Sequence, residues 1–327
     1  MRRPVIALLF VLAGGGSMFC NRSGPGQVGG RGGPGPADKL DRTLWAAPDT
    51  SAISKSADSS LIRYGRSLIA ETSRYFGPLG RISKEANGMN CQNCHLDAGT
   101  RPWGNNYAGV YSTYPKFRER RGSVETIVQR VNDCFERSLN GRALDSTSRE
   151  MHAIMAYLKW LASGVARGQK PAGSGLLALK YLERAADTAR GHQLYVAKCA
   201  RCHGPAGEGK ADSLGIGYQY PPLWGDHSFT TAAGLYRLSR MAGYIKANMP
   251  FGTSWQSPAI TDEEAWDLAA FVNSRPRAAK LFPKDWPDKS LKPVDHPFGP
   301  YTDSFPESQH KFGPFGPIQK LHQPKSK

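Results

Sequence analysis

Acidic residues are scarce in this sequence relative to basic ones. The chain has 27 Asp and Glu residues against 43 Lys and Arg, which gives a formal charge of +16 at pH 7 over 327 residues. Such an excess favours anionic partners. Nucleic acid is a common anionic partner, but the basic residues are dispersed along the chain and no familiar nucleic-acid-binding motif occurs. We therefore expect no nucleic-acid partner.

Long apolar runs are missing after the N-terminus. The first 20 residues, MRRPVIALLFVLAGGGSMFC, hold two arginines, an apolar run from Val5 to Ala13 and then small residues. This order is typical of a secretory signal, and the run is short for a membrane span. Cys20 adds the alternative of a lipid anchor, although Phe19 is large where a lipoprotein signal has a small residue. We expect a periplasmic or otherwise exported protein, with a membrane tether through Cys20 as the alternative to a cleaved leader.

Alternating runs of β-branched residues are also missing, so the sequence predicts an all-α chain with long loops. Apolar residues recur at helical spacing over residues 60–76, 148–164, 186–199 and 261–276. In the last range Thr261 is a predicted N-cap, Glu264 holds the capping-box position and Pro276 ends the helix.

Cysteine is rare, and four of the 6 cysteines lie in two C-x-x-C-H motifs. In such a motif the two thiols reach the vinyl groups of one porphyrin, and the histidine points at the iron. Zinc or a disulfide between the neighbours would use the same cysteines, but neither requires histidine at the next position. The motifs therefore predict two covalently bound haems c. Their residues are Cys91, Cys94 and the iron ligand His95 for the first haem, and Cys199, Cys202 and the iron ligand His203 for the second.

The two motifs lie in two halves of similar order, separated by Gly- and Pro-rich stretches. We expect two cytochrome c-like haem domains in tandem. The predicted division is a signal peptide or lipid-anchor leader (1–20), a Gly/Pro-rich linker (21–38), an N-terminal cytochrome c domain with the first haem (39–165), a linker (166–178), a C-terminal cytochrome c domain with the second haem (179–280) and a Pro-rich tail (281–327).

The sixth ligand of the second iron is predicted to be Met249. It follows His203 by 46 residues, and Pro250 ends any helix there, so Met249 lies in a loop that can approach the iron. Met241 is an alternative in mid-helix, and Lys246 lies three residues before Met249.

No Met-Pro loop follows the first motif. Ligand candidates for the first iron include Met151, His152 and Met155, but they lie on a helix whose apolar spacing is typical of packing. Cys134 is a further candidate, because it follows His95 by 39 residues, a reach comparable to that of Met249 from His203. Cys134 lies at the edge of an apolar helical stripe. The stripe is Val124, Ile127, Val128, Val131, Phe135 and Leu139.

Arg130, Cys134 and Ser138 recur every four residues and so stack along one line of that helix. The cationic neighbour favours a thiolate, and KFRERR (116–121) adds positive charge upstream. Three readings of Cys134 stay open: a buried free cysteine, a disulfide with Cys20, and a haem thiolate ligand.

Residues 60–275 resemble the thiosulfate dehydrogenase family, through the segments GMNCQNCHLDAG, RVNDCFERSLNG and ANMPFG. The resemblance implies an exported enzyme that joins two thiosulfates into tetrathionate, or catalyses the reverse, and passes electrons to a small c-type cytochrome or similar acceptor. It also implies that Cys134 is the distal ligand of the catalytic haem, with Arg120, Arg130 and Ser138 binding substrate. The family has lysine as a further ligand at the second haem, but Asn248 precedes Met249 here.

Two other functions remain open. One is a non-catalytic dihaem electron-transfer cytochrome, in which Cys134 belongs to the core. The other is a cytochrome subunit of a sulfur-oxidising multienzyme system.

Overall fold

The computed structural model describes residues 44–322, so the predicted leader, residues 21–38 and Cys20 lie outside the described range. The described chain is mostly helical, and its strands form two antiparallel two-stranded ribbons, which agrees with the predicted all-α class. No helix within these residues is both long and apolar enough to cross a bilayer. The α-helices are α2 (Ser59–Ala70), α3 (Thr72–Phe76), α4 (Leu96–Gly99), α5 (Val110–Thr113), α6 (Ile127–Arg137), α7 (Arg149–Leu161), α8 (Thr188–Lys198), α9 (Ala200–His203), α10 (Leu238–Asn248), α11 (Asp262–Ser274), α12 (Glu307–Phe312) and α13 (Gly316–His322). The ribbons pair β1 (Lys116–Arg118) with β2 (Ser123–Glu125) and β3 (Lys210–Ala211) with β4 (Tyr218–Tyr220), and four 3₁₀ helices complete the set: η1 (Thr50–Lys55), η2 (Cys91–Asn93), η3 (Gly234–Tyr236) and η4 (Lys289–Leu291).

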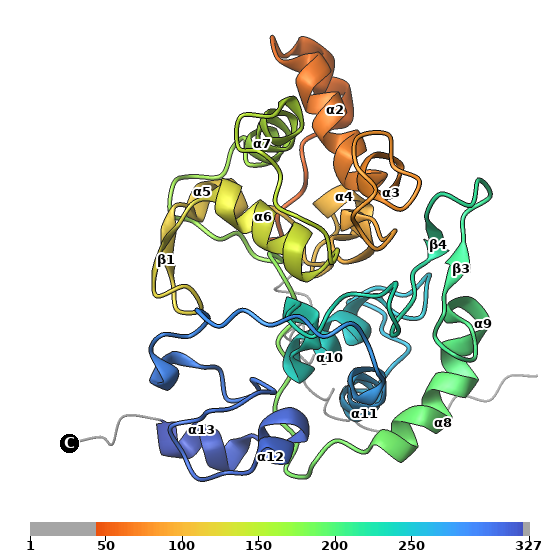
Figure 1. Ribbon diagram of the computed structural model, residues 1–327, viewed down its shortest axis with the longest axis vertical. Helices are drawn as coiled ribbons and strands as arrows, with labels where there is room; N and C mark the ends of the chain where they lie inside the picture. Colours follow the sequence, from red (N-terminus) through yellow and green to blue (C-terminus); the bar gives the residue numbers. More distant parts are fainter. Residues whose placement is uncertain (1–43, 323–327) are drawn as a thin grey trace, which may run out of the picture.

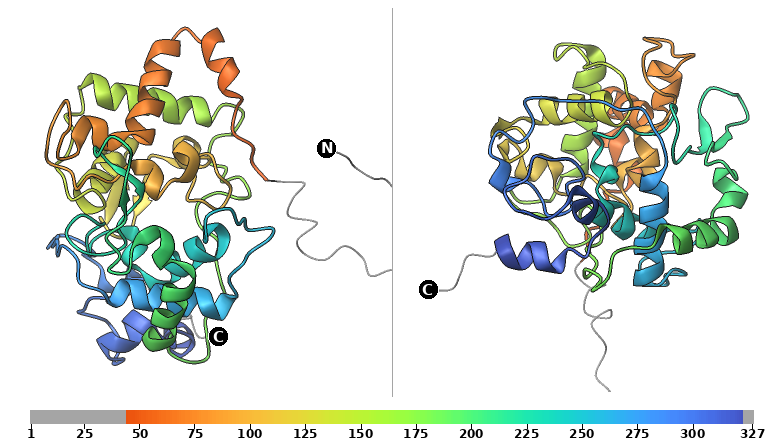
Figure 2. Two further views of the ribbon diagram at one scale, coloured as in Figure 1. Left: turned by 90° about the vertical axis from the view of Figure 1, so that its right-hand side faces the viewer. Right: turned by 60° about the horizontal axis from the view of Figure 1, so that its bottom comes forward.

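The helices form two bodies of the same design, stacked on each other (Figures 1 and 2). In the first body α2 crosses α7, and in the second α8 crosses α11. A β-carbon on Gly65 would lie 1.9 Å from the carbonyl oxygen of Ala153, and one on Gly191 would lie 2.0 Å from that of Asp267. Each crossing therefore requires a glycine where the two backbones touch. This shared helix crossing supports the tandem arrangement predicted from the sequence.

Helix boundaries follow local capping more closely than apolar spacing. The range 60–76, predicted as one helix, is broken at Glu71, whose φ of −126° and ψ of 39° are not helical. At α11 the predicted cap is confirmed, because the Thr261 hydroxyl accepts from the Glu264 N–H and the Glu264 carboxylate accepts from the Thr261 N–H.

A second capping box fixes the start of α6. Thr126 and Gln129 exchange side-chain-to-backbone hydrogen bonds, so the helix begins at Ile127. Val124 lies in β2 with 61% of its surface exposed, so its inclusion in the apolar stripe was wrong. Phe135 and Leu139 are buried as expected, and both line one cavity together with Cys134.

The C-terminal segment (281–322) packs against both bodies. It leaves α11, passes under the β1–β2 ribbon and ends in α12 and α13 (Figure 1). The N–H of Trp286 donates to the carbonyl of Arg120 at 2.7 Å, and Phe315 and Ile318 are buried in the core of the second body. The segment predicted as a Pro-rich tail is thus part of the packed structure.

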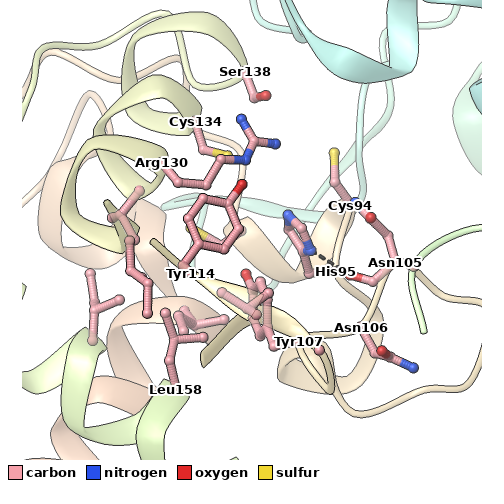
Figure 3. A pocket seen from close by; sticks show the side chains of 18 of the residues that line it. Cys94, His95, Asn105, Asn106, Tyr107, Tyr114, Arg130, Cys134, Ser138 and Leu158 are labelled. Carbon is pink, nitrogen blue, oxygen red and sulfur yellow. Dashed lines mark hydrogen bonds between the residues drawn. The ribbon is translucent and has the colours of Figure 1, made fainter. Parts of the chain in front are cut away.

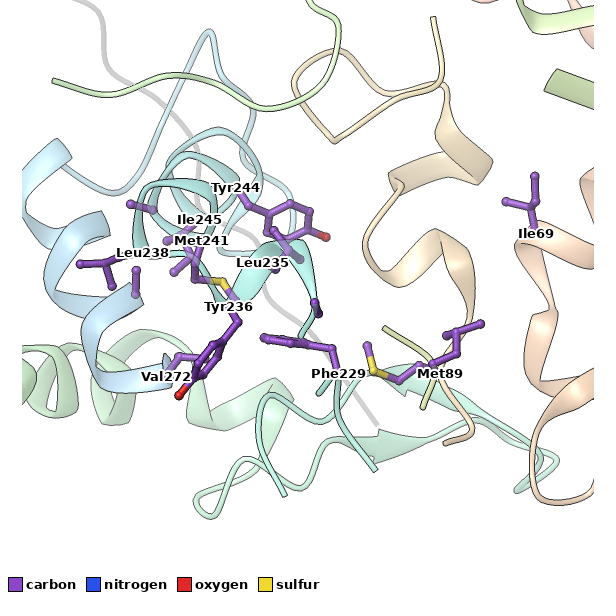
Figure 4. Packing of buried hydrophobic residues seen from close by; sticks show 14 of the residues in the cluster. Ile69, Met89, Phe229, Leu235, Tyr236, Leu238, Met241, Tyr244, Ile245 and Val272 are labelled. Carbon is purple, nitrogen blue, oxygen red and sulfur yellow. The ribbon is translucent and has the colours of Figure 1, made fainter. Parts of the chain in front are cut away.

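The segment that carries the first C-x-x-C-H motif lies against the second body. The amide of Asn87 donates to the carbonyl of Ser228 at 2.8 Å, and the Tyr244 hydroxyl donates to the carbonyl of Asn93 at 2.7 Å. Met89 and Phe229 fill the space between the bodies within one buried cluster (Figure 4). These contacts fix the two motifs relative to each other.

Candidate functional site

The first C-x-x-C-H motif lines a mainly apolar cavity of about 220 Å³ together with α6. Nδ1 of His95 donates to the carbonyl of Asn105 at 2.5 Å, and its ring stacks on Tyr107 with centroids 4.4 Å apart. Burial lowers the pKa of His95 to about 4, so the ring is neutral. With Nδ1 occupied, Nε2 is left free, as a histidine that binds a metal requires.

Cys134 lies on the opposite wall of this first cavity, facing His95 (Figure 3). Arg130 and Ser138 lie one turn before and after it, so the predicted line of three side chains is present. The negative charge of a Cys134 thiolate raises the pKa of Arg130 above its ordinary value, although burial opposes this. Arg130 therefore places a positive charge next to the Cys134 sulfur.

The alternative ligands on α7 do not reach the first cavity. Met151 is buried elsewhere in the core, His152 is exposed, and neither these two nor Met155 is among the cavity's lining residues. The side chains that α7 contributes to this cavity are Ile154 and Leu158.

The second motif lines a cavity of about 320 Å³. Nδ1 of His203 donates to the carbonyl of Pro221 at 2.8 Å, which repeats the arrangement at His95. Met249 follows the last residue of α10 and lines the cavity, as does Met241 from within that helix. Lys246 does not line it: its ammonium donates to the carbonyl of Ile260 and pairs with Asp262, both at 2.8 Å.

The two cavities adjoin. Met89 and Cys94 line both of them, so the first motif forms part of the wall of the second cavity. Groups held in the two cavities are therefore neighbours separated by one layer of side chains.

A third cavity, of about 110 Å³ and mainly polar, opens beside Cys134; we call it the arginine cavity. It shares Cys94, His95, Asn105, Arg130, Cys134 and Ser138 with the first cavity. The cations that line it are Arg118 and Arg120 from the β1–β2 region, Arg130 from α6, and Arg237 and Arg240 from the start of α10.

Sequence reasoning found Arg120, Arg130 and Ser138 but missed the other three arginines of this cavity. Arg118 lies within the basic run KFRERR (116–121). Arg237 and Arg240 belong to the second body, about 100 residues further along the chain, and only the packing of the two bodies brings them to Cys134. The spacing of arginines on the α10 helix gives no signal of this contact.

Positive charge in the arginine cavity is only partly compensated. Arg237 is paired with the buried Asp295, and Arg118 lies 3.5 Å from Glu125. Within residues 44–322, Arg120, Arg130 and Arg240 have no carboxylate partner. Burial, and then the charges of Arg137 and Arg130, lower the pKa of Arg120 to about 10, which still leaves it protonated at neutral pH. An anion in this cavity would relieve the repulsion.

Comparison with known proteins identifies the same two halves. Residues 82–166 match the family model of the SoxA/TsdA cytochrome c domain, and residues 188–276 match that of cytochrome c. Thiosulfate dehydrogenase of Allochromatium vinosum is 43% identical over 74% of this chain and 87% of its own length, and that of Psychrobacter arcticus is 37% identical over 74% and 71%. The chain belongs to the thiosulfate dehydrogenase family. The solved thiosulfate dehydrogenase (TsdBA) from Marichromatium purpuratum superposes with a TM-score of 0.66 at 28% identity, over 76% of this chain and 52% of that one.

The residues present fit two haems. Each cavity has a cysteine pair to attach the porphyrin, a neutral histidine with Nε2 free, and a mainly apolar lining. Lys116 and Lys170 also line the first cavity and supply cations suited to haem propionates. As a member of this family with two cytochrome c domains, the chain carries two covalently attached haems c.

Proposed function

We propose that this protein oxidises two thiosulfates to tetrathionate at the arginine cavity, or catalyses the reverse, and transfers the electrons to an external acceptor. The observation that supports this best is the position of Cys134. It lines both the first haem cavity and a cavity rich in arginine, so one sulfur atom adjoins an iron site and an anion site. A cytochrome that only relays electrons has no need of this arrangement.

The chemistry requires two electrons to leave and one S–S bond to form. When bound, the two haems accept one electron each, which matches the two electrons released. The Cys134 thiolate and the sulfane sulfur of the first thiosulfate form an S–S bond with loss of these two electrons. The sulfane sulfur of a second thiosulfate then attacks the cysteine-bound sulfane sulfur, the Cys134 thiolate leaves, and tetrathionate is released. No proton is taken up or lost.

The arginines make this encounter feasible. Two thiosulfates bring four negative charges together, and their mutual repulsion requires fixed cations. Arg130 stands beside Cys134, where its planar guanidinium suits two sulfonate oxygens at once. Arg120 lies in the same cavity without a carboxylate partner among the described residues, and the Ser138 hydroxyl is free to donate a hydrogen bond. We assign these three side chains to substrate binding.

In this proposal electrons leave the protein through the second cavity, where His203 and Met249 would hold the haem iron and the haem would supply one-electron transfer. This cavity adjoins the first through Cys94 and Met89, which gives a short route between the irons. A thioether ligand raises the reduction potential and so favours transfer in this direction. The acceptor is a small c-type cytochrome or similar carrier. Export follows from the leader-like residues 1–20, and a tether at Cys20 stays an untested prediction.

A steady-state assay of the purified holoprotein tests this function, with thiosulfate plus an artificial acceptor and with tetrathionate plus a reductant. The variant Cys134→Ala is expected to lose at least about 10³-fold in kcat while keeping both haems, because it removes the sulfur nucleophile. His152→Ala, an exposed change on α7, is the matched control and should behave as wild type. Full activity of Cys134→Ala would overturn the role of Cys134 in the reaction, whereas a wild type with neither activity would favour the non-catalytic electron carrier.

A further inference from the structure

A fourth cavity lies behind the arginine cavity, between the C-terminal segment and the second body. It has a volume of about 220 Å³, and we call it the lysine cavity. Its walls come from residues 231–237, Lys280 and the stretch from Leu281 to Pro300. Arg120, Ala233 and Arg237 line both this cavity and the arginine cavity, so a single layer of side chains separates the two.

Positive charge dominates the lining of the lysine cavity. Lys280, Lys289 and Lys292 face it together with Arg120 and Arg237. The ammonium groups bond only to carbonyl oxygens: Lys280 to Gly141 at 3.0 Å, Lys289 to Trp286 at 2.5 Å, and Lys292 to Phe298 and Pro300 at 3.0 and 2.9 Å. Within residues 44–322 no carboxylate pairs with any of the three lysines.

The single carboxylate in the lining is already neutralised. Both oxygens of Asp285 accept from the guanidinium of Arg137 at 2.7 Å. Burial lowers the pKa of His296, also in the lining, to about 4, so this ring contributes no charge at neutral pH. The lysines therefore form an excess of positive charge in a partly enclosed space, where an oxyanion would bind more strongly than at an open surface.

We propose that the lysine cavity is a second sulfur-oxyanion site, which holds a thiosulfate next to the catalytic one. The identity of the anion rests on the proposed function, whereas the excess of cations does not. A volume of about 220 Å³ is room for roughly seven waters at about 30 Å³ each, and so for one thiosulfate with a few waters. An anion held here, one side-chain layer from the arginine cavity that Cys134 lines, raises the local concentration of the second reactant.

Thiosulfate binding to the electrochemically reduced holoprotein tests this site, because the reduced protein cannot oxidise the ligand. Isothermal titration calorimetry should give two thiosulfates per chain for wild type and one for the double variant Lys280→Met/Lys289→Met. Lys284→Met is the matched control: it is an exposed lysine of the same segment outside the cavity lining, and it should keep two sites. One site in wild type, or two in the double variant, would overturn the proposal.

Two further measurements separate this site from folding and from catalysis. Crystals of the wild-type holoprotein soaked in selenate should show anomalous selenium density between Lys280 and Lys289, and an empty cavity would count against the site without recourse to any variant. In steady-state assays the double variant should raise the KM for thiosulfate by about tenfold with kcat unchanged. A wild type that binds two thiosulfates without oxidising them would refute the proposed function alone, and an active wild type with one binding site would refute this inference alone.

Discussion

The backbone N–H of Trp286 donates to the carbonyl of Arg120 at 2.7 Å, and the guanidinium carbon of Arg120 lies 5.7 Å from the centre of the Trp286 ring. Two positions far apart in the sequence are thus joined beside the arginine cavity. Trp286 is itself held by a hydrogen bond from its indole N–H to Nε2 of His296 at 2.9 Å. The C-terminal segment therefore positions an arginine that we assign to substrate binding.

The variant Trp286→Leu should raise the KM for thiosulfate several-fold, with a smaller change in kcat. A partly desolvated cation–π contact contributes about 1–2 kcal/mol, and losing it frees the Arg120 side chain. Trp286→Phe retains an aromatic face and should recover most of the affinity for thiosulfate. If Trp286 acted through packing alone, recovery would not depend on the aromatic face. Identical KM values for wild type and Trp286→Leu would show that Arg120 needs no such support.

Asp295 ties the same segment to Arg237 and should make the fold sensitive to acid. Burial alone would raise the pKa of Asp295, but the charge of Arg237 and the hydrogen bonds from Ser239 outweigh burial and hold the pKa below its usual range. The ionised carboxylate therefore stabilises the fold fully above the unfolded pKa of about 3.9, and this stability is lost as pH falls toward the lower folded pKa.

The variant Asp295→Asn should lose about 3 kcal/mol of stability at pH 7, because it leaves the mostly buried Arg237 without its counter-charge. Thermal melting across pH 2.5–7, a range chosen to bracket about 3.9, measures this loss. The difference from wild type should shrink at the acid end. Asp226→Asn, at an exposed position, is the control. A difference that stays constant with pH would mean that the charge of Asp295 contributes nothing.

Local signals in the sequence predicted the parts of the site that a short segment contains. The C-x-x-C-H motifs, the capping box of Thr261 and Glu264, and the line of Arg130, Cys134 and Ser138 each lie within a few residues. Contacts made by packing left no such signal. Arg237 reaches the site from the second body, and the Pro-rich composition of the C-terminal segment gave no indication that Trp286 would support Arg120.

Met249 and Met241 both line the second haem cavity, so the axial ligand can be tested directly. Met249→Leu should lower the reduction potential of the second haem by on the order of 100 mV, because it removes a thioether from a loop position free to bind iron. Met241→Leu, within α10, should leave the potential nearly unchanged. Redox titration followed by absorbance measures both. The reverse pattern would make Met241 the ligand.

Lys246 provides a further check at this haem. Its ammonium is bonded to Asp262 and to the carbonyl of Ile260. Lys246→Met should therefore leave the absorbance spectrum of both redox states as in wild type. A difference in absorbance spectrum between Lys246→Met and wild type would mean that this lysine leaves Asp262 to bind the iron.

Arg130 is the cation next to Cys134, and the geometry of its side chain should matter as well as its charge. Arg130→Lys keeps the positive charge but loses the planar fork that holds two sulfonate oxygens, so kcat/KM for thiosulfate should fall by about 10–100-fold. Arg121→Lys is the matched control, because Arg121 pairs with Glu125 and Asp133 and does not line the arginine cavity.

Steady-state rates at several ionic strengths separate the contribution of the Arg130 charge from that of its planar geometry. Long-range attraction is screened by salt in wild type and in Arg130→Lys alike, so the slope of rate against salt should be the same for both while the rates differ. A Lys variant as fast as wild type would mean that Arg130 acts through its positive charge alone. The paired hydrogen bonds to the sulfonate oxygens of thiosulfate would then have to come from Arg120.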